Sequence, residues 1–209
     1  MLRGKFITFE GGEAAGKSTQ AKRLAARLEG AGLGTLVTRE PGGTPLGEDI
    51  RGLILKDHPQ EPVTELLLFA AARAEHMTSV IRPALDEGTW VISDRFMDST
   101  RVYQGKHYRI EREFISQLEK YTVAPDYPTL TLIIDLPAEV SMERANTRGT
   151  LSRYDAARLE THQLLREGFL EIADSEPDRC VIIDGMLTPD NVEAAVWQAV
   201  NERLLAKVL

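Results

Sequence analysis

The chain has 209 residues, with 25 Lys and Arg against 32 Asp and Glu (formal net charge −7), 43% hydrophobic residues and one cysteine. This length favours one domain over residues 1–209, and the acidic balance disfavours broad binding to nucleic acids or anionic membranes, which basic surfaces attract. Because the lone Cys180 cannot form an intrachain disulfide and no apolar run approaches the about 20 residues that span a bilayer, we expect a cytoplasmic protein that is neither exported nor inserted in a membrane.

Short β-branched and apolar runs alternate along the chain with longer segments of helical period. The predicted strands are Lys5–Glu10, Thr35–Arg39, Trp90–Asp94, Leu130–Leu136 and Cys180–Asp184. The predicted helices are Ser18–Glu29, Leu46–Leu55, Glu65–Asp86, Glu111–Tyr121, Ala138–Thr147, Ala156–Asp174 and Asn191–Val208. This alternation predicts a three-layer α/β domain with a parallel sheet and crossover helices. The charged, polar stretch 144–158 is predicted to be a mobile surface segment.

The strongest chemical signal is the run GGEAAGKS from Gly11 to Ser18. It fits the pattern G-x-x-x-x-G-K-[ST] and lies between a predicted strand and a predicted helix. Glycines allow successive backbone N–H groups to point inward, and the helix that follows adds its positive N-terminal end. The run therefore predicts a cradle for a di- or triphosphate, with Lys17 on the outer phosphates and the Ser18 hydroxyl on Mg²⁺.

Charged residues follow the second and third predicted strands, where the carboxyl ends of parallel strands line a ligand crevice. Asp94 suits a metal-bound water, and Arg95 beside it indicates an anion on the acceptor side, with a structural salt bridge as the alternative. Arg39 opens the turn REPGGT, whose paired glycines permit close approach of the backbone. Glu13, inside the phosphate loop, is expected to face a hydroxyl of a second substrate or metal-bound water, with plain solvent exposure as the alternative.

One predicted helix face, and one segment just after the third predicted strand, combine an aromatic ring with polar side chains. Phe69 and Arg73 are four residues apart, so they share one face and can offer a stacking ring and a forked donor to one ligand. A core phenylalanine with a surface arginine is the alternative. A similar face, made of Ser99, Thr100, Tyr103 and Gln104, follows Asp94 and Arg95. Spacing alone does not separate a base pocket from an ordinary helix surface here.

Three arginines, Arg144, Arg148 and Arg153, lie in the polar segment after the fourth predicted strand. A mobile arginine can stabilise the charge of a transferred phosphoryl group and exclude water as it closes. A solvated basic face is the alternative. The four histidines have no metal-ligand spacing, and we assign them no role.

Taken together, these residues resemble the thymidylate kinases, P-loop nucleoside monophosphate kinases, in their bacterial type. The matching segments are FEGGEAAGKST, TREPGGTPLGEDIR, LLLFAAARAEH, WVISDRFMDSTRVYQG, PDYPTLTLIIDLP and RANTRGTLSRYD. The resemblance implies a five-stranded parallel sheet of order 2-3-1-4-5 and a short mobile lid over about residues 144–158. It also implies transfer of the ATP γ-phosphoryl group to dTMP, which gives dTDP and ADP with Mg²⁺ in dTTP synthesis, by a homodimer.

The resemblance also implies roles for individual residues. The implied catalytic residues are Lys17, Asp94, Arg95, Arg148 and Arg153, with Arg153 favoured over Arg148. The implied ATP-binding residues are Gly11, Gly12, Glu13, Ala14, Ala15, Gly16, Lys17, Ser18 and Thr19. The implied dTMP-binding residues are Glu13, Arg39, Phe69, Arg73, Arg95, Thr100, Tyr103 and Gln104. Mg²⁺ is assigned to Ser18 and Asp94, directly or through water.

Three other functions compete with this interpretation. A kinase for another nucleoside monophosphate would share the phosphate loop and the arginines, because these do not read the base. A non-catalytic ATP-binding switch would bind nucleotide without turnover. A DNA-handling ATPase is disfavoured by the acidic balance.

The segment from Gly105 to Ile110 carries fewer glycines than bacterial relatives usually have, which predicts a bulkier and more positive turn beside the acceptor.

Overall fold

The computed structural model describes residues 2–56, 60–147, 154–155 and 157–206. Its centre is one sheet of five parallel strands in the order β2-β3-β1-β4-β5, which confirms the predicted order. The strands are β1 (Phe6–Glu10), β2 (Thr35–Arg39), β3 (Trp90–Asp94), β4 (Leu130–Asp135) and β5 (Cys180–Asp184). Both ends of every strand lie within one residue of the predicted ends.

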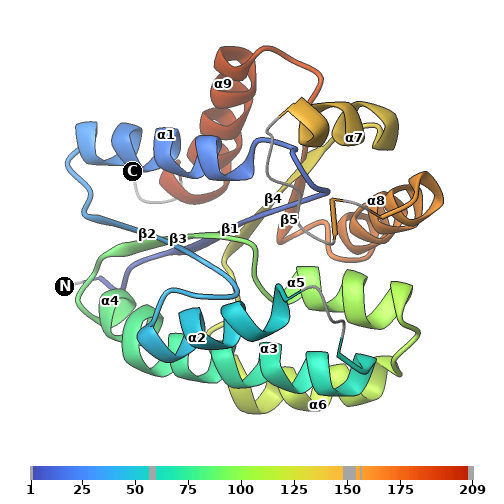
Figure 1. The fold of residues 1–209 in the computed structure, drawn as a ribbon. Coiled ribbons are helices and arrows are strands. Elements are labelled where there is room, and N and C mark those ends of the chain that lie inside the picture. The colour runs from blue at the N-terminus through green and yellow to red at the C-terminus, as the bar shows by residue number, and fades with distance from the viewer. Residues whose placement is uncertain (1, 57–59, 148–153, 156, 207–209) are drawn as a thin grey trace.

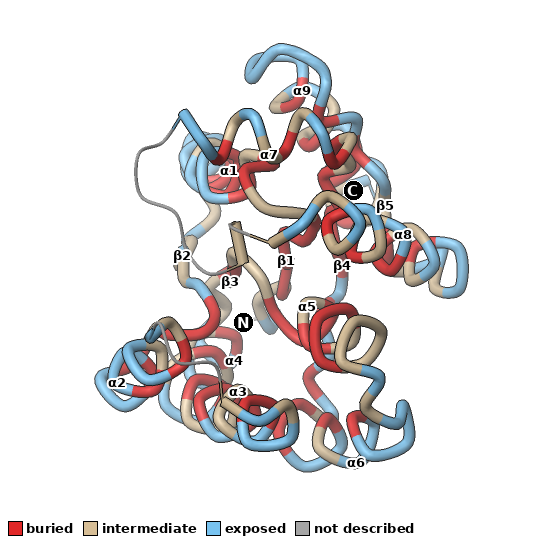
Figure 2. Tube along the Cα trace, turned by 45° about the vertical axis from the view of Figure 1, so that its right-hand side comes forward, coloured by how far each residue is buried: buried red, intermediate tan, exposed pale blue. Residues whose placement is uncertain are grey.

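Burial of the strands follows their place in the sheet. All five residues of the central strand β1 are buried, and β3 and β4 are buried except at their last residue. The edge strands β2 and β5 are less buried: β2 has only partly buried and exposed positions, and β5 has two exposed positions beside its buried Cys180 and Ile183. Strands covered by helices on both faces read as continuous apolar runs, which is why the central strands were readable from sequence. Figure 2 shows this buried centre surrounded by exposed outer helix surfaces.

Helices cover both faces of the sheet (Figure 1). The helices are α1 (Lys17–Gly30), α2 (Pro45–Ile54), α3 (Pro62–His76), α4 (Arg82–Asp86), α5 (Met97–Thr100), α6 (Arg112–Thr122), α7 (Ala138–Thr147), α8 (Leu159–Ser175) and α9 (Pro189–Val200). Helices α1 and α9 pack with Ile7, Phe9 and Leu132 in the largest apolar cluster. Side chains from the α3–α4 run and from α8 pack with Phe6, Val91 and Ile133 in the other clusters.

The structure differs from the predicted helices in four places. Helix α8 begins at Leu159, later than the predicted start at Ala156, and Ala157 and Arg158 are not helical. The predicted helix Glu65–Asp86 begins earlier, at Pro62, and passes through a π-helical turn at Met77–Ile81 before α4. The π-helical turn Asn201–Leu205 continues α9. Sequence analysis described no separate helix after the third strand, whereas α5 and the π-helical turn Arg101–His107 form one there. Its polar, ligand-facing side chains obscure the apolar periodicity from which helices are predicted.

The predicted mobile segment 144–158 overlaps a helix at its start. Residues 144–147 form the last turn of α7, and Arg144 donates to the carbonyl oxygen of Gly185 at 3.2 Å. Residues 148–153 and 156 lie outside the described residues. Among the described ranges, no helix has both the length and the apolar character needed to cross a membrane.

Candidate active site

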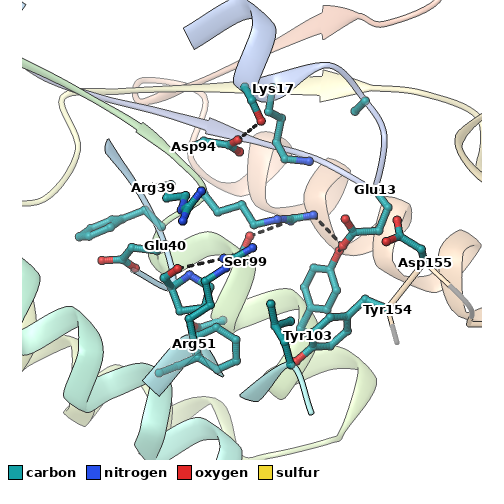
Figure 3. A pocket seen from close by; sticks show the side chains of 18 of the residues that line it. Glu13, Lys17, Arg39, Glu40, Arg51, Asp94, Ser99, Tyr103, Tyr154 and Asp155 are labelled. Atoms are coloured by element: carbon teal, nitrogen blue, oxygen red, sulfur yellow. Dashed lines mark hydrogen bonds and ion pairs between the residues drawn. The ribbon is translucent and has the colours of Figure 1, made fainter. Parts of the chain in front are cut away.

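A pocket of about 480 Å³ lies at the carboxyl edge of β1, β2 and β3. Figure 3 shows side chains from the phosphate loop, from the ends of β2 and β3, and from the chain at Tyr154 converging on this space. It is lined by these sequence-predicted residues: Glu13, Ala14, Ala15, Gly16, Lys17, Ser18, Thr19, Arg39, Phe69, Arg73, Asp94, Arg95, Thr100, Tyr103 and Gln104. One pocket therefore brings together the phosphate loop from Glu13 onward and both polar, aromatic faces, whereas the predicted Gly11 and Gly12 are not part of its lining. A volume of this size is typical of small-ligand sites.

The phosphate loop runs from the end of β1 to the start of α1. Gly11 has φ +128°, and a Cβ there would lie 2.4 Å from the carbonyl oxygen of Ile134, so only glycine fits. The buried Lys17 donates to the carbonyl oxygens of Gly11 at 3.1 Å and of Gly12 at 2.5 Å. Burial and the nearby Arg95 lower the pKa of Lys17 to about 8, against the opposing pull of nearby carboxylates. Lys17 is thus held inside the loop that it is predicted to serve.

The Ser18 hydroxyl donates a hydrogen bond to Asp94 Oδ2 across the pocket. Both groups are hard oxygen donors, which suit Mg²⁺. No group of three His, Cys, Asp or Glu side chains in the described part of the chain is arranged to hold a metal ion. Magnesium in nucleotide sites is commonly held by one or two protein oxygens plus phosphates and water, so this pair fits that cation.

Arg95 forms an ion pair with Glu13 inside the pocket, and both side chains are mostly buried. Arg95 Nη2 donates to Glu13 Oε1 at 2.7 Å, and the Tyr103 hydroxyl donates to the same oxygen at 2.7 Å. Burial alone would raise the pKa of Glu13, but the Arg95 and Lys17 cations and the hydrogen bonds outweigh it and hold this pKa at about 2. Solvent exposure, the alternative for Glu13, is therefore wrong, because its side chain is only 17% exposed.

The turn that carries Arg95 is held by a carboxylate that sequence analysis missed. Arg95 has φ +70°, an uncommon conformation for a residue with a Cβ. The buried Glu10, at the end of β1, accepts from the backbone N–H groups of Phe96 at 2.8 Å and Ser99 at 3.2 Å, and from Ser99 Oγ at 2.6 Å. Burial and the nearby Asp98 raise the pKa of Glu10 to about 7. Glu10 reads from sequence as one more strand residue, so no local signal marked it.

Two further arginines lie beside Arg95 in the lining. Arg39 is the last residue of β2 and pairs with Glu48 at 3.0 Å, and Arg51 of α2 donates to the carbonyl oxygen of Pro41 at 2.9 Å. Burial and the Arg39 cation lower the pKa of Arg51. Arg51 was not among the predicted site residues, although it ends the matching segment TREPGGTPLGEDIR. The only sequence signal for Arg51 was its position about two helical turns after the Thr44 cap, which places its side chain on the face of α2 nearest the crevice.

The opposite part of the lining offers an aromatic ring and hydrogen-bonding groups. Phe69 and Arg73 share one face of α3, as predicted. Arg73 is buried and donates from Nη2 to Thr100 Oγ1 at 3.0 Å, so the alternative of a surface arginine is wrong. Gln104 donates from Nε2 to Glu65 Oε1 at 2.7 Å, and the Tyr154 hydroxyl donates to the same atom at 3.0 Å.

The predicted lid arginines Arg148 and Arg153 lie outside the described residues. The described part of this segment contributes Tyr154 and Asp155 to the lining. The Tyr154 ring lies edge-on to the Tyr103 ring, with 5.4 Å between their centroids. Tyr154 was not among the predicted site residues, although it follows Arg153 directly.

Comparisons with known proteins agree with this geometry. The sequence model of the thymidylate kinase family matches residues 9–196. The chain is 50% identical to a thymidylate kinase of Bradyrhizobium diazoefficiens over 97% of this chain and 91% of the relative. It is also 50% identical to one of Caulobacter vibrioides over 98% of this chain and 99% of that relative. A crystal structure of thymidylate kinase from Ehrlichia chaffeensis, 35% identical, superposes with a TM-score of 0.77 over 95% of this chain and 99% of that chain. On the pocket, the sheet order and these matches, the chain belongs to the thymidylate kinase family.

Proposed function

We propose that this chain transfers the γ-phosphoryl group of ATP to dTMP, which gives dTDP and ADP in the synthesis of dTTP. The observation that carries the proposal is a single pocket in which a complete phosphate loop faces a stacking ring and base-reading side chains. Family membership supports the same reaction. The dTMP phosphate oxygen attacks the γ-phosphorus as the bond to the β-bridging oxygen breaks, and ADP leaves.

ATP is assigned to the loop from Gly11 to Thr19. Its backbone N–H groups and the N-terminus of α1 bind the phosphates, and Lys17 contacts the outer ones. Mg²⁺ held by Ser18, and by Asp94 directly or through water, would neutralise charge on the β- and γ-phosphates when bound. The attacking oxygen belongs to an already ionised phosphate, so no side chain has to remove a proton from it. Asp94 is therefore assigned to positioning through Mg²⁺ or its water and not to proton removal.

The acceptor phosphate is assigned to Arg39 and Arg95, and Arg51 joins them. The lowered pKa of Arg51 supports this, because clustered cations favour an anion among them. Arg95 and Arg39 can offer forked donors to phosphate oxygens. Glu13 lies beside the acceptor sugar in this arrangement. The ring of Tyr103, whose hydroxyl donates to Glu13, fills the space that a ribose 2′-OH would need.

The base side offers a donor and an acceptor in the order that thymine needs. Phe69 supplies the stacking ring. Within the described residues, Arg73 Nη1 and Gln104 Oε1 make no hydrogen bond, and both side chains line the pocket. Arg73 can donate to O4 and Gln104 can accept from the ring N3–H, with Thr100 steadying Arg73. Cytosine presents an amino group and an unprotonated nitrogen at these positions, so the same pair disfavours it.

The finer assignments complete the proposal. The chain acts as one domain over residues 1–209, with a lid over about 144–158, in the cytoplasm, without binding nucleic acid or membrane. It forms a homodimer, which is supported by exposed apolar side chains on three helices: Leu46 and Leu53 of α2, Val63 and Leu67 of α3, and Phe114 of α6.

A panel of acceptors tests the proposed reaction. ADP formation is measured with Mg·ATP against dTMP, dUMP, UMP, CMP, AMP and GMP at equal concentration. We expect rapid turnover with dTMP and little with UMP, because Tyr103 disfavours a 2′-OH. Preference for another acceptor would retain a kinase but overturn the base pocket. ATP binding without turnover on any acceptor would favour the switch.

The lid assignment makes a separate prediction about Arg153. Arg153→Ala should lower kcat by about tenfold to a thousandfold while changing the Kd of dTMP much less, because a lid arginine acts on charge that develops during transfer. Steady-state kinetics and equilibrium dTMP binding measure the two effects. Arg112→Ala, at an exposed position at the start of α6 and outside the pocket lining, is the control. An Arg153→Ala enzyme with unchanged kcat would overturn the lid role.

A further inference from the structure

A buried polar network adjoins the base side of the pocket, and Glu40 and Arg73 belong both to it and to the pocket lining. It joins Glu40, which follows β2, to Arg73 and His76 on α3, and it reaches Thr38 within β2. Glu40 is 5% exposed and His76 is fully buried. Buried charged and polar groups are costly unless they are hydrogen-bonded, so the partners of these groups bear directly on their role. Neither His76 nor the Glu40 side chain was among the residues predicted to form the site.

The network is a chain of three hydrogen bonds. Arg73 Nε donates to Glu40 Oε2 at 2.8 Å, and His76 Nδ1 donates to Glu40 Oε1 at 3.1 Å. The other ring nitrogen of His76, Nε2, lies 2.7 Å from Thr38 Oγ1. Because an ionised carboxylate only accepts, the proton on the Glu40 side of His76 is carried by Nδ1. Both oxygens of Glu40 are therefore engaged, one by the arginine and one by the histidine.

The loop after β2 is shaped to leave room for this network. Gly43 has φ +79°, and a Cβ there would lie 2.4 Å from His76 Nε2 and 2.7 Å from Thr38 Oγ1. The backbone N–H of Glu40 donates to the carbonyl oxygen of Asp94 at 3.0 Å. The backbone that carries the carboxylate is thus hydrogen-bonded to the last residue of β3, which fixes Glu40 at the carboxyl ends of β2 and β3.

These contacts constrain the Arg73 guanidinium from several directions. Nε is bound by Glu40, Nη2 is bound by Thr100, and the guanidinium carbon lies 5.1 Å from the centroid of the Phe96 ring. Nη1 is the nitrogen that makes no hydrogen bond to any described residue. A planar guanidinium held at two nitrogens has little freedom to turn the third. The direction in which Arg73 can donate to a ligand is therefore determined by its partners.

Direction matters because two pyrimidines differ at the group that a single donor would meet. Thymine presents the O4 acceptor, whereas cytosine presents the N4 amino donor. A loosely held arginine could turn away from the N4 amino group and tolerate cytosine. An arginine held in place keeps its N–H donor facing the N4 amino donor, and this contact is unfavourable. The discrimination then depends on the groups that hold the arginine as well as on the arginine itself.

We propose that Glu40 and His76 are positioning residues that set the preference for thymine over cytosine by holding Arg73. This inference rests on the base pocket proposed above. Glu40 supplies the charged acceptor that orients the guanidinium, and His76 orients Glu40 from the opposite oxygen. Neither side chain is assigned a contact with the substrate.

Glu40→Gln is the first test, because it keeps the side-chain shape but removes the charge. Steady-state kinetics with saturating Mg·ATP give kcat and KM for dTMP and for dCMP. We expect KM for dTMP to rise by about tenfold to a hundredfold, the range for a lost hydrogen bond to a charged group, with kcat within about threefold. The dTMP to dCMP ratio of kcat/KM should fall, and KM for ATP should stay within about twofold of wild type.

The chain offers a matched control in Glu119→Gln. Glu119 is also 5% exposed and accepts two hydrogen bonds from one arginine, from Arg101 Nε and Nη2 at 2.7 Å each, but it does not line the pocket. Thermal melting of both variants measures the shared cost of removing a buried carboxylate. We expect the control to melt lower than wild type and to leave the dTMP to dCMP ratio unchanged.

A double-mutant cycle tests whether Glu40 acts through Arg73. Arg73→Met alone should raise KM for dTMP, and Glu40→Gln added to it should change KM by less than about twofold. For His76, the Phe variant removes the donor to Glu40 and should raise KM for dTMP about twofold to tenfold. His76→Asn keeps an N–H near the Nδ1 position and should recover part of that loss.

The outcomes separate this inference from the proposed function. Wild-type values of KM and base preference in Glu40→Gln, or an effect that multiplies that of Arg73→Met, would overturn the positioning role. A wild-type enzyme that does not use dTMP, or an Arg73→Met enzyme with unaltered dTMP kinetics, would instead overturn the proposed base pocket. If the His76 variants do not fold, the Glu40 variants and their cycle still decide.

Discussion

Lys17→Ala is expected to lower kcat at least about a hundredfold to a thousandfold, which is the usual loss when one stabilising donor is removed from developing charge. Lys17 is buried, and within the described chain its hydrogen-bond partners are the carbonyl oxygens of Gly11 and Gly12. The cation is thus placed in the loop with no acidic side chain hydrogen-bonded to it. Phosphates that enter the loop would supply the missing negative charge. Initial rates of ADP formation at saturating ATP and dTMP measure the effect.

Loss of folding would not explain that result. Burial and Arg95 lower the pKa of Lys17 from 10.5 to about 8, so the folded state disfavours the charged lysine relative to the unfolded chain. At pH 7 the lysine is charged in both states, and alanine removes this unfavourable burial. We expect the variant to melt at or above the wild-type temperature. Lys22→Ala, at an exposed position of α1, is the control. A Lys17→Ala enzyme with kcat within threefold of wild type would contradict the assignment.

Arg95→Ala is expected to lower kcat/KM for dTMP by about a thousandfold, because two losses coincide. The acceptor phosphate loses a forked donor, and Glu13 loses the cation that holds its pKa at about 2. Without Arg95, a buried carboxylate faces the acceptor phosphate as a like charge. Kinetics with varied dTMP at fixed Mg·ATP measure the change.

The Arg95 prediction needs variants that separate charge from geometry. Arg95→Lys retains the cation beside Glu13 but loses the fork, so we expect it to lie between wild type and Arg95→Ala. Arg166→Ala is the matched control, because Arg166 forms two hydrogen bonds with Asp135, at 2.7 and 2.8 Å, and does not line the pocket. Equal activity in Arg95→Ala and Arg166→Ala would show that Arg95 does not bind the acceptor.

Much of the fold was readable in advance, since its signals are local. The buried strands β1, β3 and β4 appear in the sequence as continuous apolar runs. The phosphate-loop motif predicts both the end of a strand and the start of a helix. Helix α5 escaped prediction for the complementary reason. Thr100 on α5, and Tyr103 and Gln104 just after it, face the pocket, so its pattern follows the ligand site and not the apolar core.

The same contrast holds for the site. Lys17, Ser18 and Arg95 were marked by neighbours in the chain, whereas Glu10 and Glu40 carry no local signal beyond being charged residues near a strand end. Arg51 is marked only by its helical phase after the Thr44 cap. The roles of Glu10 and Glu40 depend on partners that are distant in sequence. Glu10 meets Ser99 89 positions away, and Glu40 meets Arg73 33 positions away.

By itself, the sequence determined the alternation of strands and helices, the phosphate loop and the family resemblance, because each depends on residue types at short, regular spacing. Tertiary structure alone decided that Glu13 pairs with Arg95 across 82 positions and that Arg73 on α3 is held by the Glu40 carboxylate, which directly follows β2. The physical reason is that parallel strands bring their carboxyl ends to one edge, where charges from separate segments must neutralise one another once water is excluded.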